Sequence, residues 1–69
     1  MRSGGRAAYL AEAAQWPRRV AFEQAHPGSG FYRVGTMTQA YVPVGGESMT
    51  VTRPTLREVL DALGKIFGG

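Results

Sequence analysis

The chain has 69 residues, no cysteine and a formal net charge of +3, from eight Lys or Arg residues against five acidic ones. This length allows only one domain, and the lack of cysteine excludes a disulfide framework and the commonest structural zinc ligand. No apolar run approaches the ~20 residues of a membrane-spanning helix, so we expect a cytoplasmic protein without a membrane partner.

Composition divides the chain into three parts. We predict a flexible lead at residues 1–5, a single α+β domain at residues 6–67 and a Gly-Gly tail at residues 68–69. A domain of this size has a narrow stability margin, and formation of a homodimer would widen it.

The first helix is predicted at residues 6–16, an alanine-rich run with Tyr9, Leu10 and Ala13 as its buried stripe. Pro17 is expected to end this helix at Trp16, because the residue before a proline avoids the α region. Arg18 and Arg19 would then lie near the negative end of the helix.

Three extended segments are predicted next. Residues 19–25 alternate between apolar and polar side chains, which is typical of a half-buried strand. Residues 26–30 favour a turn, and residues 31–44 favour either one long strand bent at Gly35 or two short strands. Gly45-Gly46 predicts a hairpin turn, followed by a return strand at residues 48–52.

The clearest pattern is a capped amphipathic helix at residues 55–67. Thr55 and Glu58 have the spacing of a capping box, and Gly68 follows the last apolar residue as a helix C-cap does. The apolar stripe consists of Leu56, Val59, Leu60, Leu63 and Phe67.

These elements predict an α+β fold of order α-β-β-β-α, with both helices on one face of a three-stranded antiparallel sheet and the other face open. The side chains expected to face the helices are Val20, Phe22, Tyr32, Val34, Val42, Met49 and Val51. Those expected on the open face are Arg19, Glu23, Arg33, Gln39, Tyr41, Thr50 and Thr52.

This open face suggests a binding function. Arginine pairs with phosphates and aromatic rings stack on bases, so we predict a non-catalytic module for an anionic partner, with nucleic acid preferred to an acidic protein surface. The predicted binding residues are Trp16, Arg18, Arg19, Arg33, Gln39, Tyr41 and Arg53.

The alternative is a protein-interaction module, such as a small inhibitor, adaptor or antitoxin-like subunit, phage-encoded ones included, that acts by occlusion. The segment Ser48 to Thr52 carries no charge that would block its edge. Such an edge can pair with a second copy or with a target protein.

The chain offers little material for catalysis. His26 is the only histidine and lies in the predicted turn, and no spacing of residues suits a metal ion. The glycines do not form a phosphate-binding loop. We therefore predict no enzyme activity, no catalytic residue, no metal and no cofactor.

Two resemblances concern topology and the C-terminus. The element order is similar to that of double-stranded-RNA-binding domains, which contact phosphates through lysines at the start of their last helix. This chain has Thr55, Leu56, Arg57 and Glu58 there, so we assign no family. The ending Gly68-Gly69 is similar to the diglycine of ubiquitin-like and sulfur-carrier proteins, but a helix runs directly into it and a C-cap accounts for both glycines.

Overall fold

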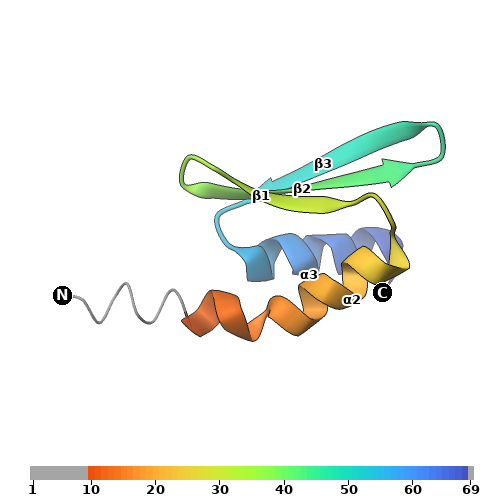
Figure 1. The fold of residues 1–69 in the computed structure, drawn as a ribbon. Coiled ribbons are helices and arrows are strands. Elements are labelled where there is room, and N and C mark those ends of the chain that lie inside the picture. Colours follow the sequence, from red (N-terminus) through yellow and green to blue (C-terminus); the bar gives the residue numbers. More distant parts are fainter. Residues whose placement is uncertain (1–9, 69) are drawn as a thin grey trace.

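The computed structural model describes residues 10–68 and contains helices and one antiparallel sheet (Figure 1). A helical segment at residues 10–14 leads into helix α2, Trp16–Ala25. Three strands follow, β1 (Gly30–Val34), β2 (Met37–Val44) and β3 (Glu47–Arg53), and helix α3 (Leu56–Phe67) comes last. The predicted α+β fold, with helix, three-stranded antiparallel sheet and C-terminal helix, is confirmed.

The sheet is built from two successive hairpins in the spatial order β1-β2-β3. Gly35-Thr36 joins β1 to β2, and Val34 is paired with Met37 across that turn. Gly45-Gly46 joins β2 to β3, and Val44 is paired with Glu47. Gly35 and Gly45 both have φ of 63°, which glycine adopts without steric cost. Of the two readings of residues 31–44, two short strands is therefore the correct one, and the Gly45-Gly46 hairpin is confirmed.

Both helices lie on the same side of the sheet, and the other side is open (Figure 1). Helix α3 packs against β2 and β3. The central core consists of Ala40, Val42, Val51, Val59 and Leu63, with Phe22, Phe31, Met49, Ala62 and Phe67 packed around it. The two helices thus bury one apolar face of a small sheet.

Helix α3 has the ends that its sequence predicts. The Thr55 hydroxyl accepts a hydrogen bond from the Glu58 backbone N–H at 3.2 Å and donates one to the Glu58 carboxylate at 2.9 Å. Gly68 adopts the left-handed conformation and donates its N–H to the Gly64 carbonyl at 2.7 Å. Leu56, Val59, Leu60 and Leu63 are buried, so the predicted stripe and caps of this helix are confirmed.

Residues 19–25 are helical, and their prediction as a strand is wrong. Pro17 is the second residue of α2, where its missing N–H needs no intrahelical partner and its fixed φ suits the first turn. Arg19 and Glu23 form an i,i+4 ion pair at 3.2 Å, which a helix allows and an extended strand does not. The alternating pattern contains only two apolar residues, Val20 and Phe22, and is too short to distinguish a strand from a helix.

Proline begins a helix here instead of ending one at Trp16. The earlier helical segment stops at residue 14, and Gln15 is the N-cap of α2. Leu10 and Ala13 are exposed, so their predicted burial is also wrong. Tyr9 and residues 6–8 of that predicted helix lie outside the described residues. Arg18 and Arg19 belong to the first turns of α2 and not to a helix C-terminus.

Candidate interaction surface

The outer face of the sheet carries no charged residue, and no helix in the part of the chain that the structure describes covers it. Buried Ala40 and Val42 alternate with outward-pointing residues, and the pairing of strands extends this assignment to β1 and β3. The outer face carries Tyr32, Val34, Met37, Gln39, Tyr41, Pro43, Ser48, Thr50 and Thr52. Tyr32, Val34 and Tyr41 are 55%, 51% and 38% exposed, which concentrates apolar surface over β1 and β2.

Tyr32 and Tyr41 are close neighbours on this face. Tyr41 is paired with Gly30, and a Cβ atom placed on Gly30 would lie 2.6 Å from the Tyr32 hydroxyl oxygen. The Tyr32 side chain therefore extends over Gly30 toward the position opposite Tyr41. Glycine is the one residue that leaves room for this arrangement, and the result is an aromatic area at the end of β1 nearest to α2.

The facing of β1 differs from the prediction. Tyr32 and Val34 point outward, while Phe31 and Arg33 lie on the helix side, opposite Ala40 and Thr38. The cause is the two-residue turn at Gly35-Thr36, which places residues 34 and 37 on the same face. A single alternation carried through residues 31–44 therefore assigned β1 to the wrong face, while the predicted outward positions of Gln39, Tyr41, Thr50 and Thr52 are correct.

None of the predicted arginines lies on the outer face. Arg18 joins the two helices through an ion pair with Asp61 at 2.9 Å, and its other nitrogen donates to the Gln15 amide oxygen at 2.8 Å. Arg33 donates to the Thr38 hydroxyl at 3.2 Å and lies 3.8 Å from the Glu12 carboxylate. The expected mixture of arginine and aromatic side chains on the open face is thus not present.

Trp16 and partly buried Arg19 form a separate pair on α2. The Arg19 guanidinium lies 4.2 Å from the centre of the Trp16 ring, and Trp16 is 50% exposed. Arg19 is also bound to Glu23, so it is held at this position from two sides. The predicted grouping of Trp16 with Arg18 and Arg19 is therefore split, because Arg18 turns toward α3.

Arg53 ends β3 on the helix side of the sheet. Thr38 of β2 is paired with Arg53 of β3 on one side and with Arg33 of β1 on the other. The three residues therefore form a row across the end of the sheet. The Arg53 guanidinium donates to the Thr52 carbonyl at 2.8 Å. The positive charge of this row is separated from Tyr32 and Tyr41 by the sheet itself.

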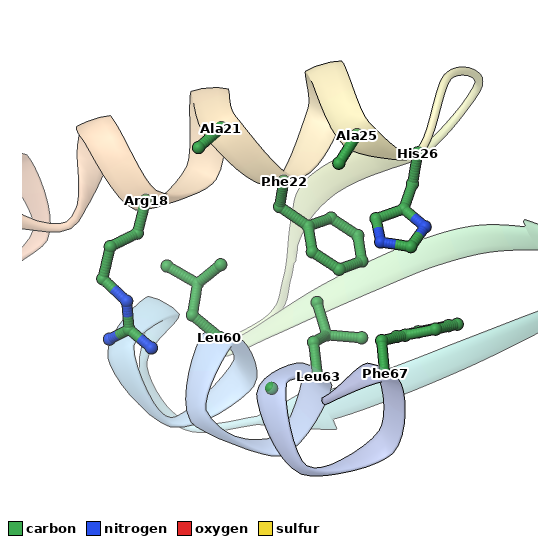
Figure 2. Close-up of a pocket in the computed structure, with 9 residues that line it drawn as sticks. Arg18, Ala21, Phe22, Ala25, His26, Leu60, Leu63 and Phe67 are labelled. Carbon is green, nitrogen blue, oxygen red and sulfur yellow. The ribbon is translucent and has the colours of Figure 1, made fainter. Parts of the chain in front are cut away.

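An apolar cavity of about 300 Å³ lies between α2 and α3. Figure 2 shows Arg18 at one end of it, His26 at the other, and Phe22 between them above Leu63 and Phe67. The His26 ring stacks on Phe22 with a centroid distance of 4.2 Å and lies 4.7 Å from Phe67. His26 follows the last residue of α2, so it ends the helix and closes an aromatic cluster with Phe22, Phe31 and Phe67.

The only pattern that could have indicated this cluster is the i,i+4 spacing of Phe22 and His26, which has meaning only once the segment is known to be helical. The cavity is lined by side chains that hold the two helices together. Arg18 is already bound by Asp61 and Gln15. We therefore assign the cavity to helix packing, which leaves the outer face of the sheet as the candidate interaction surface.

Two further features are missing from the part of the chain that the structure describes. No group of three or more His, Asp or Glu side chains within residues 10–68 is placed to hold a metal ion. No helix in the same part of the chain has the length and apolar character needed to cross a bilayer.

Comparisons with protein-family models, with curated proteins and with solved structures found no match to this chain.

Proposed function

We propose that this chain is a non-catalytic binding module that engages a protein partner through the outer face of its sheet. The observation that carries the proposal is the uncharged outer face, on which two exposed tyrosines and Val34 lie uncovered. Tyrosine is enriched among the residues that dominate binding energy at protein interfaces, and charged residues are depleted at interface centres. The hydroxyl row of Ser48, Thr50 and Thr52 beside the tyrosines supplies a polar border.

The chemistry of this face defines the partner. An uncharged aromatic surface favours a protein surface with apolar side chains at its centre and hydrogen-bonding groups at its border. Nucleic acid requires cations at the phosphate contacts, because phosphate neutralisation supplies most of the affinity. Arg18, Arg19 and Arg33 are each paired with a carboxylate away from this face, which weighs against that partner. A module of this kind acts by occluding or bridging a larger protein.

The test begins with partners captured from the native host on the tagged chain, with and without nuclease. Each captured protein is purified and its direct affinity measured for the wild type and for the double variant Tyr32→Ser with Tyr41→Ser. We expect the double variant to bind at least about tenfold more weakly, the usual consequence of truncating interface tyrosines.

The matched control is the pair Arg33→Gln with Arg53→Gln, which changes only the helix side of the sheet. It should leave the affinity within about twofold, since rim or distant charges add little to binding energy. If a purified partner bound the tyrosine variant as tightly as the wild type, the proposal would be wrong.

A second candidate is nucleic-acid binding, favoured by the neighbouring tyrosines on an antiparallel sheet and by the net charge of +3. It requires single-stranded nucleic acid, whose bases can stack on exposed rings. In the same experiment, nucleic-acid binding predicts that nuclease treatment abolishes the capture of partners. It also predicts an affinity that falls steeply with salt, and loss of binding in the Arg33→Gln, Arg53→Gln variant.

A further inference from the structure

Within residues 10–68, strand β3 is a free edge of the sheet, with β2 on one side only. The two-residue turn at Gly45-Gly46 makes Val44 and Glu47 a hydrogen-bonded pair, so the backbone groups of residues 47, 49, 51 and 53 point toward β2. The N–H and C=O groups of Ser48, Thr50 and Thr52 consequently point away from the sheet. They form a short row of backbone donors and acceptors that a second strand can use.

The sequence of β3 is complementary to itself when two copies run antiparallel about Thr50. In that register Glu47 of each copy lies opposite Arg53 of the other, which gives an opposite-charge pair at both ends. Met49 lies opposite Val51, and both of these belong to the helix side of the sheet. Ser48 lies opposite Thr52, and Thr50 meets its own copy, so the outer face is matched by hydroxyl pairs.

The backbone agrees with the same register. In this register the residues with outward-pointing backbone N–H and C=O groups meet one another, Thr50 with Thr50 and Ser48 with Thr52. Each such pair can exchange two N–H···O bonds. Pro54 is the next residue whose backbone would face the second copy, and it has no N–H to donate. The pairing of the strands therefore ends just after the Glu47–Arg53 charge pair. Side chains, charges and backbone therefore select one alignment.

We infer that this chain forms a two-fold symmetric homodimer by antiparallel pairing of β3 with β3 of a second copy, centred on Thr50. The dimer joins two three-stranded sheets into one of six strands, with the outer faces continuous and all helices on the other side. The interface is isologous, as a two-fold dimer requires. This inference depends on the edge of the sheet and stands apart from the partner proposed for the outer face.

The exposed flank of helix α3 also favours the β3 edge as the contact between the two copies. Leu60 and Gly64 line the cavity toward α2. Ala62 and Ile66 lie about 200° further round the helix, on the flank facing away from α2. Because α3 packs on β2 and β3, this flank is on the side of the free edge. Ile66 is 51% exposed there, and a second copy at β3 would reduce that exposure.

Charge reversal tests the register. Glu47→Arg places two arginines at each end of the paired strands, and Arg53→Glu places two acids there. Each single variant should dimerise on the order of tenfold more weakly, since two symmetric pairs change from attraction to repulsion. The double variant carrying both changes restores opposite charges and should recover dimerisation to near the wild-type level. Sedimentation equilibrium measures the dissociation constant, and circular dichroism checks that each variant is folded.

Cysteine cross-linking tests the symmetry axis, because the chain contains no cysteine of its own. In Thr50→Cys the two Cα atoms would lie about 5.5 Å apart, within the range of a disulfide. Thr52→Cys is the matched control, exposed on the same face of the same strand. It should not form a disulfide with itself, but a mixture of Thr52→Cys with Ser48→Cys should form the mixed disulfide.

Either of two results would overturn the inference. One is a wild-type chain that remains monomeric up to high micromolar concentration. The other is a dimer that the single charge reversals leave unchanged, or that cross-links through Thr52→Cys as readily as through Thr50→Cys.

Discussion

Leu63 is one of the largest fully buried side chains, so its truncation should strongly lower the free energy of unfolding. It is 1% exposed and packs between the sheet and α2, whereas Leu10, in the helical segment before α2, is 52% exposed. A Leu→Ala substitution at each of the two positions therefore distinguishes the loss of core packing from an effect on helix propensity alone. Leu63→Ala loses both the transfer energy of the side chain and the contacts around the space it leaves.

We expect Leu63→Ala to lower the free energy of unfolding by about 2–5 kcal/mol. Leu10→Ala should change it by less than about 0.5 kcal/mol, as surface substitutions usually do. Urea denaturation followed by circular dichroism measures both. Equal effects of the two substitutions would contradict the assignment of the core.

At the scale of elements, the hairpin between β2 and β3 depends on one glycine. Gly45 has φ of 63°, a conformation that L-residues adopt at a steric cost, while Gly46 has no positive φ. A Cβ atom added at either position meets no atom within 4 Å. The two glycines therefore differ in backbone conformation and not in available space.

Gly45→Ala is expected to destabilise the fold by roughly 1–2 kcal/mol, the cost of a left-handed conformation in an L-residue. Gly46→Ala should be close to neutral, because alanine loses less conformational entropy than glycine on folding. Thermal and urea unfolding of the two variants make the comparison, and a larger loss at Gly46 would show that the turn is not the one described.

At the scale of the whole molecule, the two helices are attached to the sheet unequally. Helix α3 buries four side chains, whereas α2 buries none and is held mainly by the Phe22 ring and the Arg18–Asp61 ion pair. An exposed ion pair of this kind contributes little to stability. Local opening of α2 should therefore require less free energy than global unfolding.

Hydrogen exchange should report this difference directly. We expect the amides of α2 to exchange faster than those of α3 and β2, whose exchange follows global unfolding. Phe22→Ala should accelerate exchange in α2 further, because it removes the contacts to Phe31 and Phe67. Equal protection in both helices would mean that α2 belongs to the same cooperative unit as the core.

Prediction of the candidate site from sequence succeeded only where strand facing was assigned correctly. Gln39 and Tyr41 were correctly placed on the open face, since β2 alternates regularly between buried and outward-facing positions. Tyr32 was assigned to the core and Arg33 to the open face, because a shift of one position transfers every side chain of a strand to the opposite face. The two-residue turn at Gly35-Thr36 caused that shift, and with it the wrong expectation of arginine beside tyrosine.

Helix α3 and the Gly45-Gly46 hairpin could be predicted from the amino-acid sequence alone. Their signals are a helical repeat, the Thr55 cap and turn glycines, all of which act between residues a few positions apart. The three-dimensional structure was needed to show that residues 16–25 form a helix, that Tyr32 joins Tyr41 on the outer face, and that His26 contacts Phe67. The contact of His26 with Phe67 depends on packing between distant segments. The other two features depend on the helix start at Pro17 and on the two-residue turn at Gly35-Thr36, which a short alternation of apolar residues does not specify.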